Sequence, residues 1–242
     1  MRQFVLPASY RGEDSITLRG KSFHYLAHVL RLKEGAVFPG MGVAGERFAL
    51  TLVFLGETSC TLAIKRTEER GGEAVVASTP RLTLYQCLCK GNAMDLIVRQ
   101  AAECGIHRIV PVQSVHSLPE TRGRADRWER VIREALQQSG TRRVPLLAPA
   151  LPLKEIPNDL HGRGIGLFFH QAPLANKTLH EYLSTYSEEI ALVIGPEGGL
   201  SEAEVALLAE AGLGAVYLGA SVLRVETAAL SAIADRAASR VI

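Results

Sequence analysis

The sequence predicts an α/β protein whose mostly parallel sheet is preceded by a smaller, mostly β domain. From residue 81 onward, short apolar strands alternate with amphipathic helices. Residues 1–66 instead contain short strands separated by glycine and charged residues. Between them, residues 67–80 (TEERGGEAVVASTP) are charged, contain Gly-Gly and end in proline, as linkers do. Because alternating strands and helices build parallel sheets covered on both faces, we expect domains at 1–72 and 73–242.

The N-terminal part has the pattern of a small barrel with one short helix. Leu26, Val29 and Leu30 follow helical spacing within residues 23–32. Runs of β-branched and apolar residues bounded by glycine and charge predict the strands. These strands are expected at residues 4–6, 15–18, 36–38, 48–53 and 60–64.

The C-terminal part alternates buried strands with helices that stop at glycines. Gly105 follows the first helix and Gly140 follows the second, which is built around Trp128. We expect strands at residues 82–88, 108–112, 166–169 and 191–194, and helices at 93–104, 124–139 and 177–186.

Composition predicts a cytoplasmic protein without a membrane segment. The 242 residues are 47% hydrophobic, which is enough for a sizeable core, yet charge, Gly or Pro interrupts every apolar stretch. The N-terminus has a short apolar patch with early acids and makes a poor secretory signal. No Cys-x-x-Cys motif is present, so we expect reduced core thiols at Cys60, Cys87, Cys89 and Cys104.

The net charge is only +2, but basic and acidic residues are unevenly distributed. Residues 1–72 carry 10 Lys and Arg against 7 Asp and Glu, and residues 81–145 carry 11 against 6. Residues 146–242 reverse the balance, with 6 against 11. A chain that is basic in its first 145 residues and acidic after them suggests a polyanionic partner on one face. Ordinary solvated charge explains the asymmetry equally well.

The most informative segment is residues 191–242. A buried strand runs directly into the sequence GPEGG, and a second short strand ends at Leu218-Gly219 before another loop. Ser201 and Glu204 form a capping-box pattern, which places GPEGG just before a helix N-terminus with free N–H groups. Two such loops at the ends of adjacent strands build ligand crevices in α/β sheets. Taken alone, GPEGG is better explained as a tight turn.

The second loop carries the sequence VLRVETA at residues 222–228. An arginine and a glutamate around a helix start also form ordinary surface pairs, and a threonine N-cap is common. In combination with GPEGG the pattern is far more specific. The sequences IGPEGGLS and LGxxVLRxETAAL resemble the C-terminal signature of the bacterial 16S ribosomal RNA uridine-N3 methyltransferase family, in the SPOUT superfamily of trefoil-knotted methyltransferases.

The resemblance extends over nearly the whole chain. Further matching positions are Met1-Arg2, His28-Val29-Leu30-Arg31-Leu32, Lys90-Gly91, Met94, Glu103, Gly105-Ile106, Ile109-Val110-Pro111, Gln138-Ser139-Gly140 and Arg143-Val144-Pro145.

The resemblance implies a PUA-like RNA-binding β-barrel at residues 1–72 and a SPOUT α/β-knot methyltransferase domain at 73–242, whose last segments thread through a loop. It also implies a homodimer that uses S-adenosylmethionine to methylate N3 of a uridine, uridine 1498 of 16S rRNA in the small ribosomal subunit. The cofactor contacts implied are Phe169, His170, Ile194, Gly195, Pro196, Glu197, Gly198, Gly199, Leu218, Gly219, Val222, Leu223, Arg224, Thr227 and Ala228.

Methylation at N3 requires the sulfonium methyl group in line with the base nitrogen and a route for the N3 proton. Arg224 is our candidate for orienting the substrate or stabilising charge on the uracil oxygens. Glu226 is a candidate base, but it could equally fix Arg224 or cap the last helix. No metal is expected, because His24 and His28 lie one helical turn apart without further ligands at suitable spacing.

Basic residues in both parts of the chain are expected to bind RNA, because phosphate contacts dominate affinity for RNA. They are Arg2, Arg11, Arg19, Arg31, Lys90, Arg122, Arg124, Arg142 and Arg143.

Several positions depart from the family pattern, and they lie outside the cofactor motif. Family lysines are replaced by Ala93 and Gln100, and a Ser-Glu-Arg-like stretch reads Ser114-Val115-His116. The family's Glu-Gln-Ser-Gly-Arg becomes Gln137-Gln138-Ser139-Gly140-Thr141. Two alternatives therefore stay open: a knotted methyltransferase with another RNA target, such as a ribose 2′-oxygen, and a catalytically silent RNA-binding assembly factor.

Overall fold

The structure is a computed structural model that divides the chain into two compact units. The first unit comprises Met1–Val75 and Leu136–Arg142, and the second comprises Val76–Ala135 and Arg143–Ile242. The expected linker at residues 67–80 lies almost entirely outside the described residues. These are 3–67, 80–119, 123–141, 143–161, 164–175, 177–183 and 188–238.

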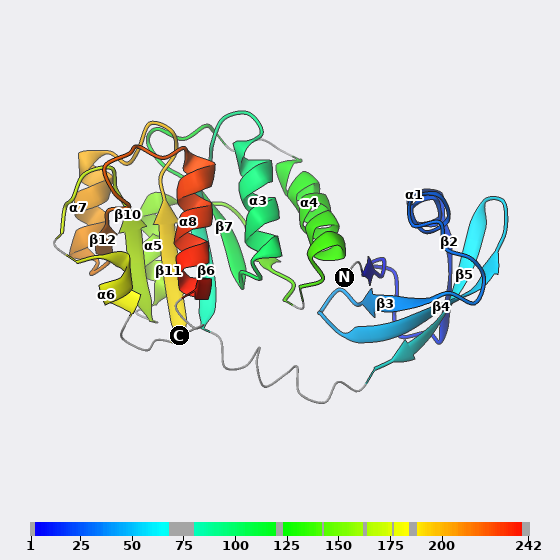
Figure 1. Ribbon diagram of the computed structural model, residues 1–242. Coiled ribbons are helices and arrows are strands. Elements are labelled where there is room, and N and C mark those ends of the chain that lie inside the picture. The colour runs from blue at the N-terminus through cyan, green and yellow to red at the C-terminus, as the bar shows by residue number, and fades with distance from the viewer. Residues whose placement is uncertain are drawn as a thin grey trace. The chain divides into compact units, whose positions relative to one another are not determined.

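The first unit is built on one five-stranded sheet with the order β1-β3-β4-β5-β2 (Figure 1). β1 pairs with β3 in parallel, and the other neighbours are antiparallel. Alternate residues of the long central strands are buried, which is the period of a half-buried sheet. The strands confirm the expected ones: β1 (Phe4–Val5), β2 (Ser15–Arg19), β3 (Val37–Met41), β4 (Arg47–Leu55) and β5 (Ser59–Arg66).

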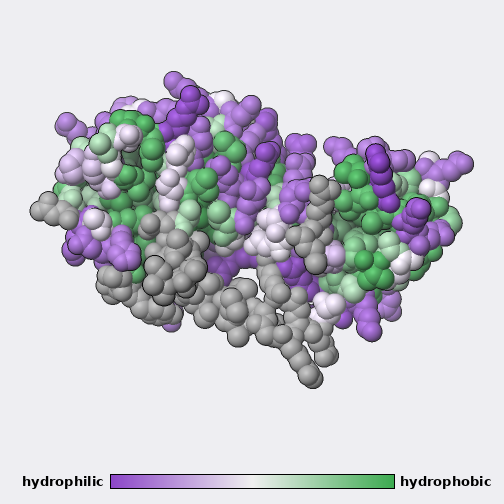
Figure 2. Space-filling view, in the orientation of Figure 1, coloured by the Kyte–Doolittle hydropathy of each residue, from purple (hydrophilic) through white to green (hydrophobic). Residues whose placement is uncertain are grey.

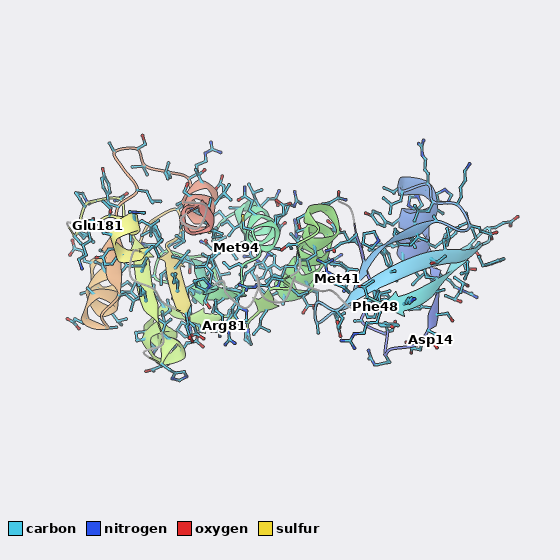
Figure 3. The ribbon with its side chains drawn as sticks, turned by 60° about the horizontal axis from the view of Figure 1, so that its bottom comes forward. Asp14, Met41, Phe48, Arg81, Met94 and Glu181 are labelled. Carbon is cyan, nitrogen blue, oxygen red and sulfur yellow. The ribbon has the colours of Figure 1, made fainter. Side chains whose placement is uncertain are left out.

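The helix of the first unit differs from the expected one at residues 23–32. It begins earlier, as α1 (Gly20–His24), and continues as a π-helical turn, η1 (Tyr25–Val29). Arg31 has φ of 52°, in the left-handed region, so the helix cannot extend to residue 32. Figure 3 shows the buried Met41 and Phe48 on the sheet of this unit.

The second unit contains a seven-stranded sheet in the order β12-β10-β11-β6-β7-β8, with β9 also pairing with β7. Every strand pair in it is parallel, as the sequence predicts. The short β8 and β9 were not expected from the sequence. The strands are β6 (Arg81–Cys87), β7 (Arg108–Gln113), β8 (Leu146–Leu147), β9 (Leu151–Pro152), β10 (Ile165–Phe169), β11 (Glu189–Ile194) and β12 (Gly214–Val216).

Helices cover both faces of this sheet. Figure 1 shows α8 and α3 in front of the strands and α5 behind them. α3 and α8 pack against each other, whereas Ile156 and Leu208 join the core on the opposite face. The helices are α3 (Ala93–Glu103), α4 (Arg124–Ser139), η2 (Leu153–Glu155), α5 (Ile156–Leu160), α6 (Leu179–Leu183), α7 (Glu202–Glu210) and α8 (Val225–Ala238).

Two expectations about the C-terminal segment need correction. β11 and β12 are not adjacent, because β10 lies between them and pairs with both. β12 also ends at Val216, before Leu218. The loop after β10 therefore lies between the two loops singled out from the sequence.

The thiols differ in one respect from the expectation. Cys60, Cys87 and Cys89 are buried, but Cys104 is exposed just after α3 and is not a core residue. Among the described residues, no helix is long and apolar enough to cross a bilayer.

Candidate cofactor pocket

A pocket lies at the carboxyl ends of β10, β11 and β12, where the three following loops meet. Its cavity volume is about 160 Å³. Because small-molecule sites usually occupy roughly 300–1,000 Å³, the pocket is a small crevice that is partly open to solvent. Figure 2 shows hydrophobic surface over this end of the unit. The lining residues are Phe169, His170, Gln171, Ile194, Gly195, Pro196, Glu197, Gly198, Gly199, Leu200, Tyr217, Leu218, Gly219, Ser221, Val222, Leu223, Val225 and Ala228.

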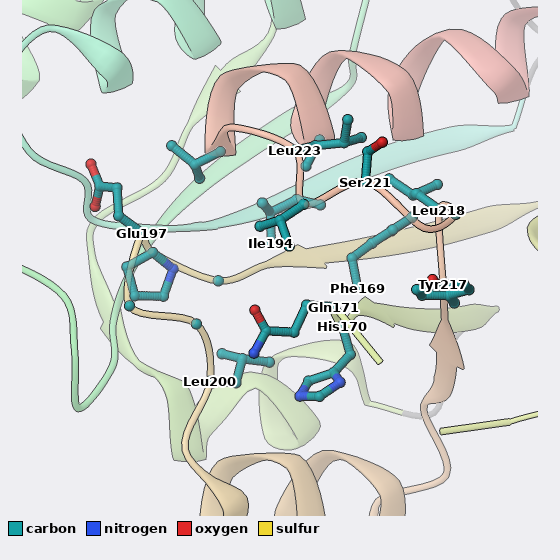
Figure 4. Close-up of a pocket in the computed structure, with 18 residues that line it drawn as sticks. Phe169, His170, Gln171, Ile194, Glu197, Leu200, Tyr217, Leu218, Ser221 and Leu223 are labelled. Atoms are coloured by element: carbon teal, nitrogen blue, oxygen red, sulfur yellow. The ribbon is translucent and has the colours of Figure 1, made fainter. Parts of the chain in front are cut away.

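The pocket combines apolar walls with a few polar side chains. Figure 4 shows His170 and Gln171 next to each other at one end, and Ser221 near Leu223 at the other. Nδ1 of His170 lies 3.1 Å from the Ala172 backbone nitrogen and 3.3 Å from the Ala172 carbonyl oxygen, and the tautomer of the ring decides which of the two it binds. The other ring nitrogen of His170 is a further hydrogen-bonding group, and Gln171 offers both a donor and an acceptor.

Two glycines leave open space at the pocket wall. Gly199 has φ of +70° and Gly219 has φ of +117°, a region that side chains disfavour. A Cβ built on either would meet no other atom within 4 Å. A ligand can therefore approach the backbone of both loops closely, which fits a cofactor held largely by main-chain groups.

Gly198 is small for a different reason. A Cβ at this position would lie 3.0 Å from Cβ of His116, which is tighter than nine in ten such contacts, so His116 would have to shift by a few tenths of an ångström. Packing against the turn after β7 therefore disfavours a larger residue here.

The GPEGG loop, residues 195–199, is followed by a capping box and is bound to two further segments. Ser201 and Glu204 form the capping box of α7 that the sequence predicts, with Ser201 Oγ accepting from the Glu204 N–H. Oε1 of Glu197 accepts the Lys90 N–H at 2.8 Å, which ties the loop to the turn between β6 and α3. Nδ1 of His116 lies 3.2 Å from the Gly199 carbonyl oxygen.

Most of the cofactor contacts implied by the resemblance lie together in this pocket. Of that set, Arg224 and Thr227 are exposed and do not line it. Five further residues line the pocket that were not predicted from the sequence. All five adjoin predicted residues, so proximity in sequence is a usable signal for them. Gln171, Leu200 and Val225 directly follow a predicted residue, and Tyr217 and Ser221 directly precede one.

The two catalytic candidates lie where α8 begins. Arg224 precedes the helix, and its side chain makes no hydrogen bond or ion pair with the described residues. Glu226 is half-buried in the first turn. Burial raises the pKa of the nearby Cys89 thiol, and the carboxylates of Glu197 and Glu226 raise it further. Of the two glutamates, Glu197 lines the pocket.

The basic residues expected to bind RNA lie in several places. Arg2, Arg122 and Arg142 lie outside the described residues, whereas Arg11, Arg19, Arg31 and Lys90 are exposed and Arg124 is half-buried. Arg143 is half-buried and donates to the Pro80 carbonyl oxygen at 3.5 Å, at the end of β6 opposite the pocket. Burial lowers the pKa of Arg143, and the neighbouring Arg81 lowers it further.

The two histidines weighed as metal ligands have ring centroids 5.0 Å apart, at His24 and His28. Within the described part of the chain, no cluster of three or more His, Cys, Asp or Glu side chains is arranged to hold a metal ion.

Comparison with known proteins identifies the family. Residues 77–235 match the family model described as an RNA methyltransferase domain. Ribosomal RNA small subunit methyltransferase E of Synechocystis sp. is 28% identical over 226 residues, covering 92% of this chain and 73% of that relative. The protein of the same name from Bacillus subtilis is 24% identical, and the alignment covers 96% of this chain and 94% of that relative.

A solved structure agrees over the whole length. Ribosomal RNA small subunit methyltransferase E from Neisseria gonorrhoeae, bound to S-adenosyl methionine, has a TM-score of 0.86 and 26% identity. The alignment covers 99% of this chain and 98% of that chain. The family resemblance seen in the sequence is confirmed: this chain belongs to the RNA methyltransferase family.

Proposed function

We propose that this protein transfers a methyl group from S-adenosylmethionine to N3 of a uridine in small-subunit ribosomal RNA, at uridine 1498. The observation that carries the proposal is the pocket at the carboxyl ends of β10, β11 and β12, lined by the GPEGG loop and by residues 217–223. The names of the Synechocystis and Bacillus relatives, and the cofactor bound to the Neisseria relative, support it.

The residues of the pocket suit this cofactor. Phe169, Ile194 and Leu200 provide apolar surface for a nucleobase, and His170 and Gln171 supply hydrogen-bonding groups. The open space at Gly199 and Gly219 allows backbone groups to reach the ligand. Bound S-adenosylmethionine would supply an electrophilic methyl group on a sulfonium centre.

The protein's remaining task is to position the uracil and to remove the N3 proton. Arg224 is free to reach a base at the pocket, because Leu223 and Val225 on either side line it. Its guanidinium would orient the uracil and stabilise negative charge on the ring oxygens. Glu226 is the candidate proton acceptor, with helix capping or orientation of Arg224 as its alternative roles.

The architecture implied by the resemblance belongs to the same proposal. Residues 1–72 would be a PUA-like RNA-binding domain, and residues 73–242 would be a trefoil-knotted catalytic domain that forms a homodimer. Phosphate contacts would come from the basic residues. These are Arg2, Arg11, Arg19, Arg31, Lys90, Arg122, Arg124, Arg142 and Arg143.

The test is to incubate the protein with methyl-labelled S-adenosylmethionine and small subunits that lack base methylation, then digest the rRNA and identify the labelled nucleoside. We expect N3-methyluridine at one position. A labelled ribose would identify a 2′-oxygen methyltransferase instead. Absence of label despite cofactor binding would identify a silent RNA-binding factor.

A further inference from the structure

His116 lies in a turn, residues 114–117, that directly follows β7. The turn is held by its own side chains, since Oγ of Ser117 accepts the Ser114 N–H at 2.8 Å. The same oxygen accepts from Nε2 of Gln113 at 2.9 Å. These bonds fix the shape of the turn, although Val115 and His116 themselves are exposed.

The turn is also bound to the start of α7. Oε1 of Glu204 accepts the Val115 N–H at 2.8 Å, and Oε2 of the same carboxylate accepts the Ser201 N–H at 2.9 Å. Glu204 is buried, so the two bonds lie in a region of low dielectric where they are strong. One carboxylate thus fixes the turn relative to Ser201, two residues after the GPEGG loop.

From this position the imidazole of His116 contacts the loop in two ways. Its Nδ1 lies 3.2 Å from the Gly199 carbonyl oxygen. Because a carbonyl oxygen only accepts, Nδ1 must carry the hydrogen. The side chain also packs against Gly198, where an added Cβ would lie 3.4 Å from Cγ of the ring.

The contact holds a peptide group that lines the pocket. The Gly199 N–H donates to the Pro196 carbonyl oxygen at 2.8 Å and closes the loop, while the Gly199 carbonyl is held by His116. On the other side, Glu197 binds the Lys90 N–H. The loop is therefore fixed from both sides by segments that follow β6 and β7.

We propose that His116 is a positioning residue for the cofactor: its Nδ1–H holds the Gly199 peptide so that the GPEGG loop is preorganised for S-adenosylmethionine. This inference rests on the proposed function, which supplies the ligand. A loop released from His116 populates other conformations, and the apparent affinity falls by the fraction of protein that stays binding-competent. The departure from the family pattern at His116 is thus connected to the cofactor site.

Two substitutions separate the hydrogen bond from the bulk of the ring. In His116→Asn the side-chain N–H₂ occupies the position of Nδ1, whereas in His116→Gln it is displaced toward the position of Nε2. We expect His116→Ala and His116→Gln to raise the Kd for S-adenosylmethionine about five- to tenfold, the range expected for one lost hydrogen bond. We expect His116→Asn to stay within about twofold of the wild type.

The measurement is calorimetric titration of each variant with S-adenosylmethionine, after thermal unfolding has shown that each is folded. Val115→Ala is the matched control, since Val115 is 70% exposed and its hydrogen bond to Glu204 uses the backbone N–H. If the wild type binds and His116→Ala binds equally well, or if His116→Asn loses as much affinity as His116→Gln, the inference is wrong. A wild type that does not bind overturns the proposed function as well.

Discussion

At the scale of single residues, the chemistry depends on Arg224, an exposed side chain without a hydrogen bond or ion pair among the described residues. We expect Arg224→Ala to lower kcat about 100-fold or more, because it removes a group that acts on charge developing in the transition state. The Kd for S-adenosylmethionine should change less than about twofold, since the side chain does not line the pocket.

Single-turnover methylation of small subunits and cofactor titration measure the two quantities separately. Arg224→Lys is the control, because it keeps the positive charge but loses the planar fork of donors. It should recover only part of the rate. An unchanged rate in Arg224→Ala would assign the stabilising role to another group.

A second prediction at this scale concerns Asp159 and the pH dependence of the free energy of unfolding. Its carboxylate accepts from Arg108 at 2.5 and 3.0 Å and from the Tyr85 hydroxyl at 2.5 Å. The Arg108 hydrogen bond lowers the pKa of Asp159 below its ordinary value of 3.8. A lowered pKa gives stability that is present above the ordinary value and is lost as the pH falls through the folded value.

We expect Asp159→Asn to lose about 2 kcal/mol of unfolding free energy at pH 7 and to show a weaker acid dependence than the wild type. Urea unfolding between pH 7 and the acid range, followed by fluorescence of Trp128, reports on the same unit. Equal acid sensitivity of the two proteins would show that other carboxylates cause it.

Most of the correctly predicted lining residues belong to a specific motif. Ile194 and the GPEGG loop were found because five consecutive residues carry the signal. Tyr217 was missed because its place in the pocket depends on how far β12 extends, and that strand is shorter than expected. Arg143 was assigned to RNA binding on charge alone, which cannot show that the side chain is half-buried away from the pocket.

At the scale of elements, α7 begins with a complete capping box, and we predict how much each of its residues contributes to the free energy of unfolding. We expect Ser201→Ala to cost about 1 kcal/mol of unfolding free energy, the usual loss for an N-cap. Glu204→Ala should cost more, because that carboxylate also accepts the Val115 N–H. Glu202→Ala, an exposed change in the same turn, is the control and should stay within about 0.5 kcal/mol.

Urea unfolding curves of the three variants at one pH give this order directly. If Glu204→Ala and Ser201→Ala cost the same, the bond to the turn after β7 would contribute nothing to stability.

The same scale shows why elements are easier to predict than their arrangement. Helix α4 was predicted at its observed bounds, because apolar spacing and a following glycine are local signals. The order of β10, β11 and β12 depends on long-range pairing, which no local pattern records. The insertion of β10 between the other two brings Phe169, His170 and Gln171 into the pocket.

At the scale of the whole molecule, the sequence pattern changes near residue 81 from successive short strands to alternating strands and helices. This change correctly indicated a β-rich part followed by an α/β part. It could not show that Leu136–Arg142 groups with the first unit. That grouping depends on Gln3, whose Nε2 donates to the Leu136 carbonyl oxygen at 2.7 Å and to that of Thr141 at 3.1 Å. The residues joined by these hydrogen bonds lie more than 130 positions apart in the sequence, so no local sequence pattern indicates the contact.

The division into two units predicts that the cofactor stabilises them unequally. All pocket residues belong to the second unit. Cofactor binding therefore raises the free energy of only those local unfolding reactions that disrupt the pocket. At a free cofactor concentration of 100 times Kd, the gain is about 2.7 kcal/mol. Hydrogen exchange with mass spectrometry should show slower exchange in peptides from β6, β10 and β11, and unchanged exchange in β4 and β5. Equal protection of both sets would mean that the chain opens as a single cooperative unit, since linkage then distributes the binding free energy over every amide that exchanges by global unfolding.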